Sequence, residues 1–282
     1  MTAEILSSIA LAQQIQNHIA LEICQLPGQP VLKVILVGDN PASQIYVQRK
    51  KNACQKVGIL CDIEEHPLTI SEAALINILQ QHGKNPNIHG ILVQFPLPQH
   101  INPSQIIEHI PPEKDVDGFH PYNLGRLASA SPFLRPCTPF GIIQLLEHYK
   151  IDLQGMDTII LGTSRIVGRP MALELLIKKA TVTLCHTKTK NLEKKIEDNQ
   201  LIIVATGNQN IIDANRLHSE HIIIDVGIHR TTDGKIRGDI DFEIARTKVK
   251  AVSPVPGGVG PMTISTLLQN LIQAYKYQHH LS

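Results

Sequence analysis

The sequence predicts a two-domain α/β protein, with an N-terminal α/β substrate domain and a Rossmann-like, doubly wound nucleotide-binding domain. The first observation is the length, because 282 residues correspond to about two domains of ~150 residues each. The second is an alternation of apolar, strand-like runs with helical patterns, which is typical of parallel sheets with helical crossovers. The third is a glycine-bearing loop that follows one such strand and opens a helix, as nucleotide-binding loops do.

The composition supports a folded protein and excludes several classes of partner. Hydrophobic residues make up 43% of the chain and charged residues 18%, which is enough apolar material for extensive burial and excludes a disordered or low-complexity chain. The 26 basic and 25 acidic residues leave a net charge of +1. Because no broad positive field results, nucleic acid and anionic membranes are not expected as main partners.

Cysteine usage and the N-terminus indicate a cytoplasmic protein. Five cysteines do not make a disulfide framework, and none has the spacing of a zinc site. His218 and His221 only loosely resemble a metal-binding pair, so no metal is expected. The first basic residue is Lys33, which argues against a secretory signal or a transit peptide. No apolar run reaches the ~20 residues that span a bilayer.

The first third of the chain alternates helices and strands. Apolar spacing from Ile5 predicts an amphipathic helix that stops at Pro27-Gly28. A proline in the first turn and a terminal glycine mark both ends of the helix 41–58, and Ser71 and Gly83 are the N-cap and the stop of another. In order, we expect a helix from residue 5, a strand 31–38, the helix 41–58, a strand 59–64, a helix 71–81 and a strand from residue 90.

The rest of the chain predicts a crossing loop and a second alternating unit. Residues 111 to about 136 are rich in proline and glycine and lack periodicity, so we expect a long loop there. Asp233-Gly234 predicts a hairpin. The other expected elements are a helix 139–149, a strand 157–162, a helix from Pro170, strands 181–185, 201–205 and 221–227, and a helix from 262 to about 277.

The final helix suggests how the domains are divided. Its apolar face at Ile264, Leu267, Leu268 and Leu271 could pack against the first domain. We therefore assign 1–137 together with 262–282 to a catalytic domain and 138–261 to the nucleotide-binding domain.

Lys50 is the first candidate for chemistry. In the helix 41–58, Tyr46, Lys50, Ala53 and Val57 fall on one stripe. A lysine held beside apolar groups is disfavoured as the cation, which suits it to proton transfer near neutral pH. Alternatively, the lysine extends its tip into water while its stem covers apolar surface. Helical spacing alone does not decide between these two interpretations.

Polar residues at the end of a buried strand and in the following loop are further candidates. Gln94 ends the strand from Gly90, where parallel sheets present ligand-binding groups. Asp115 and Asp117 stand two residues apart in an irregular segment, so one carboxylate could face a ligand while the other holds the loop. Stabilisation of a turn before Gly118 is the alternative. Residues 256–263, PGGVGPMT, allow close approach to a flat ligand or simply form a sharp bend.

The loop GTSRIVGRP, residues 162–170, lies between a strand and a helix, where backbone amides can bind a pyrophosphate. It departs from G-x-G-x-x-G, because Ser164 and Val167 replace the second and third glycines and Gly168 comes one position late. A plain strand-to-helix turn is the alternative. About 20 residues on, CHTKTK offers Thr187 and two lysines but no carboxylate, which favours NADP over NAD unless these lysines are only solvated surface.

Six segments resemble, in the same order, the bifunctional methylenetetrahydrofolate dehydrogenase/cyclohydrolase family. They are YVQRK from Tyr46, GILVQFPLP from Gly90, KDVDGFHP from Lys114, PCTP from Pro136, GTSRIVGRP from Gly162 and PVPGGVGPMT from Pro254. The resemblance implies a homodimer of two-domain subunits, each with a folate cleft between its domains. It also implies two reactions: oxidation of 5,10-methylenetetrahydrofolate with NADP+, and hydrolysis of the methenyl product to 10-formyltetrahydrofolate.

The same resemblance implies a role for each matching residue. Lys50 corresponds to the catalytic lysine, Tyr46 to the ring that stacks on folate, Gln94 to the partner that orients Lys50 and Asp117 to the acceptor for the pterin amino edge. The other implied folate contacts are Val93, Phe95, Pro256, Gly257 and Gly258, and the implied nucleotide contacts are Gly162, Thr163, Ser164, Thr187 and Ile228. Family members often carry arginine where this chain has Thr163 or Thr187, which leaves the strictness for NADP open.

Two rival functions remain open at this point. A dehydrogenase without the hydrolysis step would accumulate the methenyl intermediate, and a non-catalytic sensor would bind nucleotide or folate without turnover. Lys50 and Asp117, the residues that a sensor could most readily have replaced, are both present.

Overall fold

The computed structural model describes residues 2–209, 211–231 and 234–281. The chain divides into two compact units, of which unit 1 comprises Met1–Gln13 and Thr138–Thr263, and unit 2 comprises Gln14–Cys137 and Ile264–Ser282. Both contain helices and parallel strands, so the predicted two-domain α/β fold is confirmed. The division differs from the expected one at two places, because residues 1–13 and 262–263 belong to unit 1 and not to the unit that contains 14–137.

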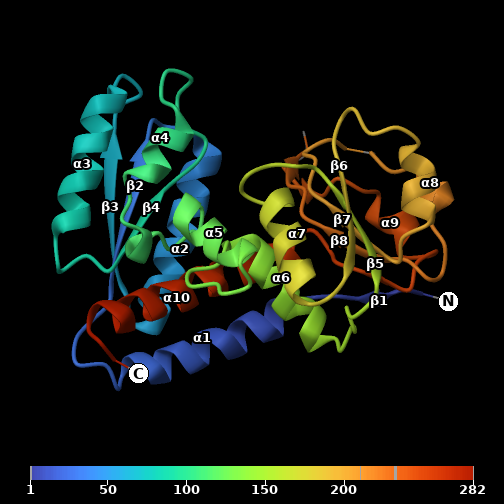
Figure 1. Cartoon of the computed structure of the whole chain (residues 1–282), viewed down its shortest axis with the longest axis horizontal. Coiled ribbons are helices and arrows are strands. Elements are labelled where there is room, and N and C mark those ends of the chain that lie inside the picture. Colours follow the sequence, from blue (N-terminus) through green and yellow to red (C-terminus); the bar gives the residue numbers. More distant parts are fainter. Residues whose placement is uncertain (1, 210, 232–233, 282) are drawn as a thin grey trace. The chain divides into compact units, whose positions relative to one another are not determined.

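Unit 2 is built on a parallel sheet in the order β3-β2-β4, three strands among its described residues. The strands are β2 (Val31–Val37), β3 (Leu60–His66) and β4 (Gly90–Val93). The long helices connecting them are α2 (Pro41–Val57) and α3 (Glu72–Lys84), and α4 (Pro103–Glu108) follows β4. Figure 1 shows these elements as the blue-to-green part of the chain.

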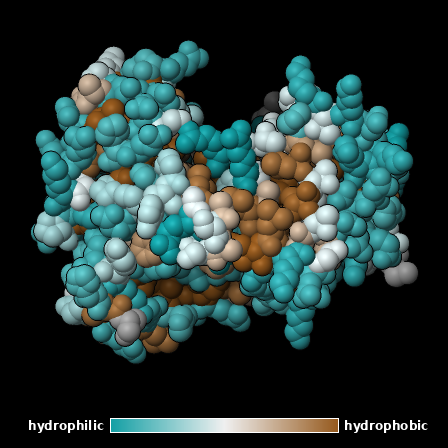
Figure 2. Space-filling view, in the orientation of Figure 1, coloured by the Kyte–Doolittle hydropathy of each residue, from teal (hydrophilic) through white to brown (hydrophobic). Residues whose placement is uncertain are grey.

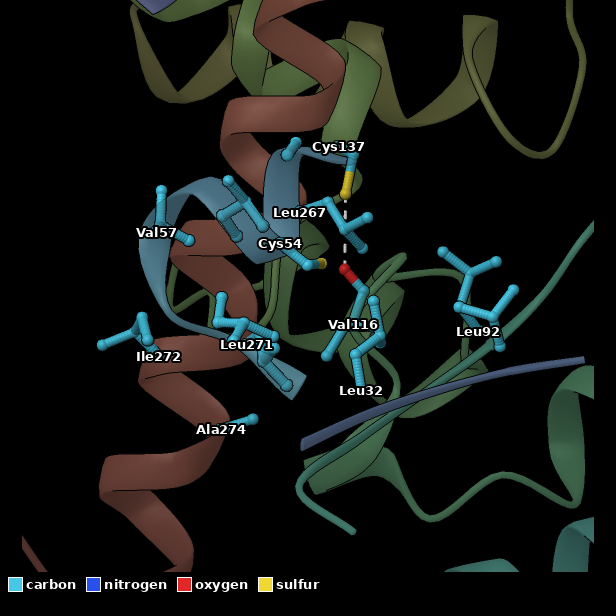
Figure 3. Packing of buried hydrophobic residues seen from close by; sticks show 14 of the residues in the cluster. Leu32, Cys54, Val57, Leu92, Val116, Cys137, Leu267, Leu271, Ile272 and Ala274 are labelled. Atoms are coloured by element: carbon cyan, nitrogen blue, oxygen red, sulfur yellow. Dashed lines mark hydrogen bonds between the residues drawn. The ribbon is translucent and has the colours of Figure 1, made fainter. Parts of the chain in front are cut away.

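Alternate residues of β2 fill the core on opposite faces of this sheet. Leu32, Val34 and Leu36 belong to a buried cluster with α2 and with α10 (Val259–Gln278), whereas Ile35 and Val37 pack with α3 and α4. Figure 3 shows Leu267 and Leu271 of α10 in the first cluster. The expected return of the last helix to the first domain is therefore confirmed, with Leu267, Leu268 and Leu271 all buried and Ile264 at the margin.

Helix α2 begins and ends where its sequence predicts. The Asn40 side chain accepts hydrogen bonds from the backbone N of Ala42 at 2.9 Å and of Ser43 at 3.2 Å, and Pro41 occupies the first turn. Gly58 ends the helix with φ of 90°, a left-handed conformation in which a β-carbon is unfavourable. Both caps orient the helix that carries Tyr46 and Lys50.

Several boundaries differ from the predicted ones. Glu4–Ile5 forms strand β1, so α1 (Ile9–Ile23) begins four residues later than expected. Helix α3 continues through Gly83 to Lys84, and α4 was not predicted. The expected loop 111–136 contains a 3-10 turn (Pro112–Lys114) and helix α5 (Pro121–Ala128). Pro121 initiates α5 instead of breaking it, because proline at the first helical position forfeits no intrahelical hydrogen bond.

Unit 1 is a parallel sheet that, within the described residues, has six strands in the order β1-β11-β8-β7-β5-β6. They are β5 (Asp157–Leu161), β6 (Thr181–Cys185), β7 (Leu201–Val204), β8 (Ile222–Asp225), β11 (Ala251–Val252) and β1. Because β1 pairs with β11, the N-terminal residues belong here. From β5 the chain first forms β6 on one side of it and then forms β7, β8 and β11 in turn on the other side. This is the predicted doubly wound arrangement.

Helices cover both faces of the sheet in unit 1. Figure 1 shows α6 (Cys137–His148) and α7 (Gly168–Ile177) on one side of its strands, and α8 (Leu192–Glu197) and α9 (Phe242–Ala245) on the other. Helix α7 begins at Gly168, two residues before the expected Pro170, and α8 and α9 were not predicted. The predicted hairpin is present as the antiparallel strands β9 (His229–Arg230) and β10 (Ile236–Arg237); Asp233, at its predicted centre, lies outside the described residues.

The surface agrees with the balanced composition. Figure 2 shows hydrophilic side chains over most of the visible face. Among residues 2–209, 211–231 and 234–281, no helix is both long and apolar enough to cross a membrane.

We predict that stability falls as the pH drops from 7 to 5, because two buried histidines resist protonation. Burial lowers the pKa of His89 to about 4, assisted by the charges of His279 and Lys114, and burial with His218 nearby lowers the pKa of His221 to about 4. Between pH 6.5 and 4 the folded state therefore binds fewer protons than the unfolded state. Each histidine should cost about 2 kcal/mol of unfolding free energy over this interval, measurable by urea unfolding.

The variant His89→Asn tests the assignment. Its side-chain oxygen can replace His89 Nδ1, which accepts from the backbone N of Val31 at 3.0 Å, but it does not titrate in this range. The variant should therefore lose the part of the decline that His89 contributes, about 2 kcal/mol between pH 7 and 5. An unchanged decline would show that His89 is not responsible.

Candidate active site

Lys50 and Gln94 are brought together by two elements of unit 2. Lys50 Nζ, on α2, donates a hydrogen bond of 3.1 Å to Gln94 Oε1, directly after β4. Gln94 is fixed by its own bonds, because its backbone N donates to Ile35 O at 2.9 Å and its Nε2 to Phe95 O at 2.7 Å. The amide nitrogen is thereby turned away from Lys50 and the amide oxygen toward it.

The stripe on α2 has the polarity that its sequence predicts. Ala53 and Val57 are buried in the core of unit 2, whereas Tyr46 and Lys50 are half-buried. The lysine nitrogen is bonded to a protein amide, so the interpretation in which its tip merely extends into water does not describe this structure. Lys50 is positioned at the end of a parallel strand, where ligand-binding groups are expected.

The two aspartates of the segment KDVDG differ in their surroundings. Asp115 is 2% exposed, and its Oδ2 accepts from the backbone N of His120 at 2.8 Å and from Asn123 Nδ2 at 2.9 Å. Asp117 is half-buried and lies close enough to Lys50 for the ammonium charge to act on it. Asp115 therefore holds the loop, and Asp117 is the carboxylate available to a ligand.

Burial dominates the electrostatics around Asp117. It raises the pKa of this carboxyl, and the positive charge of Lys50 opposes the rise. Burial likewise raises the pKa of the Cys137 thiol well above its usual value, and the charge of Asp117 adds to the rise. Cys137 Sγ donates to Val116 O at 3.3 Å, as Figure 3 shows. Cys137 is therefore a buried thiol that anchors the segment carrying Asp117.

The other expected folate contacts of unit 2 are unequally exposed. Tyr46 is half-buried one turn before Lys50, with the Arg49 guanidinium 5.9 Å from its ring centroid. Phe95 is half-buried. Val93 is 3% exposed and packs in the core on the α3 side of the sheet, so its side chain supports the strand from within.

The expected nucleotide contacts share one edge of the sheet in unit 1. Gly162, Thr163 and Ser164 follow β5, Thr187 follows β6 and Ile228 follows β8. Because these strands are parallel, their carboxyl ends meet at the same edge. Thr187 and Ile228 are exposed, and Thr163 is half-buried. These five residues therefore lie at one edge of one sheet.

Gly168 has the packing role of the missing third glycine. A β-carbon at Gly168 would collide with the carbonyl oxygen of Gly162, and one at Gly162, whose φ is 116°, would collide with Ala205 O. Glycine at these two positions lets the start of α7 approach the end of β5 closely. The one-position shift noted in the sequence therefore preserves the contact between helix and strand.

Ser164 closes the turn that leads into α7. Its Oγ accepts from the backbone N of Val167 at 3.2 Å and of Gly168 at 3.3 Å, two amides at the start of α7. Arg169 Nε donates to Thr163 O at 3.1 Å. The Ser164 hydroxyl still has a proton that it can donate to a phosphate oxygen.

Two buried aspartates, which the sequence did not single out, hold the loops at this edge together by hydrogen bonds. Asp225 accepts hydrogen bonds from the backbone N of Gly227, Asp239 and Ile240 at 2.9–3.1 Å. Asp239 Oδ2 accepts from the backbone N and Oγ1 of Thr206 and from Gly207 N at 2.8–2.9 Å, and its Oδ1 contacts His229 Nε2 at 2.7 Å. Burial raises the pKa of Asp225 to about 6. One signal was available, since Asp225 ends an otherwise apolar strand and a buried carboxylate requires partners.

The segment Pro256–Gly258 lies after β11, also in unit 1. Gly257 has φ of 104°, and its carbonyl oxygen accepts from Ser8 N at 2.9 Å and Ser8 Oγ at 3.2 Å. A β-carbon at Gly258 would lie 2.5 Å from Pro254 O. The turn is thus compact and held from the N-terminal segment. Within the described part of the chain, no group of three or more His, Cys, Asp or Glu side chains could hold a metal ion.

Fold and site together define the class of protein: a two-unit α/β dehydrogenase with a Rossmann-like nucleotide-binding unit. Comparison with known families narrows the class. The model of the tetrahydrofolate dehydrogenase/cyclohydrolase catalytic domain matches residues 6–117, and that of the NAD(P)-binding domain of the same family matches residues 136–279. The chain belongs to the tetrahydrofolate dehydrogenase/cyclohydrolase family and is an enzyme.

Individual relatives resemble the chain over nearly its whole length. It is 52% identical over 264 residues to the bifunctional protein FolD of Legionella pneumophila (strain Paris), covering 94% of this chain and 92% of that protein. The bifunctional FolD structure from Campylobacter jejuni is 44% identical with a TM-score of 0.94, covering 98% and 99%. The Trypanosoma brucei enzyme, solved with NADP and an inhibitor, is 30% identical with a TM-score of 0.92, covering 98% of each chain.

We predict that Asp239→Asn weakens nucleotide binding. The asparagine amide keeps only one accepting oxygen, so it cannot both accept from Thr206 and Gly207 and contact His229 as the two carboxylate oxygens do, and each buried partner left unpaired costs about 1–3 kcal/mol. The loops should loosen, with a KM for NADP+ raised about tenfold and a lower Tm. Asp198→Asn, at an exposed carboxylate after α8, is the control and should leave both values unchanged. If Asp239→Asn had the same KM for NADP+ and the same Tm as the wild type, Asp239 would not be holding these loops together.

Proposed function

We propose that this enzyme oxidises 5,10-methylenetetrahydrofolate with NADP+ and hydrolyses the resulting 5,10-methenyltetrahydrofolate to 10-formyltetrahydrofolate, with Lys50 as the catalytic residue. The observation that carries this proposal is the Lys50 Nζ–Gln94 Oε1 hydrogen bond beside the half-buried Asp117. These reactions belong to one-carbon metabolism, whose formyl product serves purine biosynthesis. Membership of the family and the similarity to bifunctional relatives support both activities.

NADP fits the residues of unit 1. The glycine contacts at the end of β5 leave the room for close backbone approach that a dinucleotide requires, and Lys188 and Lys190 place positive charge after β6 near Thr187. When bound, NADP+ supplies the hydride acceptor. Gly162, Thr163 and Ser164 would hold the pyrophosphate side, Thr187 the 2′-phosphate side, and the exposed side chain of Ile228 would cover apolar surface of the nucleotide.

The hydrolysis step requires one proton carrier and one water. Water adds to the methenyl carbon and one of its protons leaves through Lys50. The second water proton passes to N5 as the carbon–N5 bond breaks, which gives the formyl group on N10. Gln94 positions the Lys50 nitrogen, since Gln94 Oε1 accepts one of its protons. Without this contact, the flexible side chain would have to be ordered by the substrate itself, at a cost in rotamer entropy.

The folate is proposed to be recognised by groups of unit 2. Asp117 would accept hydrogen bonds from the amino edge of the pterin, because its carboxylate has the exposure that Asp115 lacks. Tyr46 would stack on the ring through its half-exposed face. Phe95 and the backbone of Val93 would add further contacts, and the resemblance also assigns folate contacts to Pro256, Gly257 and Gly258. Unit 2 therefore takes the catalytic, folate-binding role and unit 1 the NADP-binding role.

We also infer a homodimer in the cytoplasm. The resemblance of the six motif segments supports the dimer, and the free cysteines fit a reducing compartment. Sedimentation of the purified chain at twice the monomer mass would support the assembly.

We predict that Lys50→Met abolishes formyl production while the protein still folds and binds NADP+. Removing the proton carrier should lower the kcat of hydrolysis at least about 100-fold. Lys56→Met, on the exposed side of the same helix, is the control for charge and should retain activity. Methenyl consumption would be followed by absorbance and nucleotide binding by titration. Undiminished hydrolysis in Lys50→Met would remove Lys50 from its proposed role.

We predict that the double variant Lys188→Ala, Lys190→Ala raises the KM for NADP+ about tenfold without changing that for NAD+. The two cations would act on a 2′-phosphate that NAD+ does not have, and each exposed contact contributes about 0.5–1 kcal/mol. Steady-state assays with both nucleotides measure the ratio. If the KM for NAD+ rose as much as the KM for NADP+, the two lysines would not act on the 2′-phosphate and would be ordinary solvated surface residues.

A further inference from the structure

Two cysteine thiols face each other between α2 and β3. Cys54 lies in the last turn of α2 and is fully buried, and Cys61 is the second residue of β3 and is half-buried. Both belong to the core on the α2 side of the sheet, together with Ala53 and Val57. Figure 3 shows Cys54 among the residues of this cluster.

The connection between the two cysteines is short and tightly closed. Ile59 N donates to Cys54 O at 2.9 Å and Gly58 N to Gln55 O at 3.3 Å, so the chain turns directly from helix to strand. In β3, Cys61 and Ile63 point to the core on the α2 side, because alternate residues of a strand share a face. The backbone itself therefore brings both side chains to the same side of the sheet.

Cys54 and Cys61 lie close enough for each thiol to change the pKa of the other. The neighbouring Cys54 lowers the pKa of Cys61, and the charges of Lys51 and Lys50 also lower it, whereas burial and Asp62 oppose the shift. The neighbouring Cys61 and burial raise the pKa of Cys54. Cys61 is thus the more exposed of the two cysteines and the one that ionises to a thiolate more readily, whereas Cys54 remains a thiol. An accessible, stabilised thiolate with a second thiol beside it has the arrangement of oxidant-sensitive sites.

We propose that Cys54 and Cys61 form an oxidative modification site that closes to a disulfide when hydrogen peroxide reaches Cys61. The Cys61 thiolate attacks one peroxide oxygen, the O–O bond breaks, and the second oxygen leaves as water after taking a proton. Cys61 is thereby oxidised to a sulfenic acid. The Cys54 sulfur then attacks the sulfenic sulfur, the S–O bond breaks, and a second water leaves with the Cys54 proton. The peroxide receives both electrons that the two thiols lose.

The site lies one helical turn from Lys50, since Cys54 follows it by four residues on α2. A disulfide would therefore tie the helix that carries the catalytic lysine to β3. The chemistry of the cysteines does not depend on the proposed function, and its test reads thiols and not turnover. Failure of one proposal is distinguishable from failure of the other.

The test treats the reduced, full-length protein with hydrogen peroxide, blocks remaining thiols with iodoacetamide and digests the protein with trypsin. Cleavage at Lys51, Lys56 and Lys84 separates the cysteines into peptides 52–56 and 57–84. The expected product is this pair joined by a disulfide, with a mass about 2 Da below the sum of the two reduced peptides. Absence of the linked pair at peroxide concentrations that oxidise Cys24 overturns the proposal.

Two variants assign the order of events. In Cys54→Ala, whose folding is checked by circular dichroism, the sulfenic acid should persist at Cys61 and be trapped there by dimedone. Cys24→Ser, which removes a more exposed thiol on a different segment, is the control and should form the linked pair as the wild type does. Dimedone labelling of Cys24 about tenfold faster than of Cys61 in Cys54→Ala would show that exposure alone governs reactivity, against the proposal.

Discussion

The hydrogen bond from Lys50 to Gln94 is the interaction on which the site of unit 2 depends. Lysine is flexible and strongly hydrated, so a lysine that must meet one reacting atom needs an acceptor that does not move. Gln94 meets this need because both ends of its amide, and its backbone N, are bonded. Its direction is set by the register between β2 and β4, since a slip of one residue would turn Gln94 to the opposite face of the sheet. The chemistry of one side chain thus rests on the pairing of two strands.

In unit 1, several loops are held together at one edge of the sheet without long side chains. Asp225 and Asp239 do this from inside, by accepting hydrogen bonds from amides after β7, after β8 and at the end of the hairpin. Two buried carboxylates close together are costly, and burial together with the charge of Asp239 raises the pKa of Asp225. Their cost is offset by six backbone and hydroxyl donors that would otherwise lack partners in the interior. Loops fixed in this way are prepared for a ligand before it arrives.

The sequence was sufficient for features that local chemistry determines and insufficient for those that tertiary contacts determine. The caps of α2, the buried strands and the grouping of Lys50, Gln94 and Asp117 follow from spacing and motif. Strand β1, only two residues long, exists because β11 offers it a partner, and α5 forms although its segment is rich in residues that usually end helices. The shifted Gly168 could be interpreted only once its contact with Gly162 was known. Asp239 offered no local pattern at all, because its side-chain partners are Thr206 and Gly207, more than 30 residues away, and His229 of the hairpin.

The placement of α10 also affects how the chain is made. Its buried residues Leu267, Leu268, Leu271 and Ile272 complete the core that β2 and α2 begin, and they are synthesised after all the strands of unit 1. The apolar face of β2 and α2 therefore stays uncovered while the strands of the six-stranded sheet are synthesised. During that interval the nascent polypeptide presents a hydrophobic surface to chaperones, and a premature stop before the last helix would leave it permanently exposed.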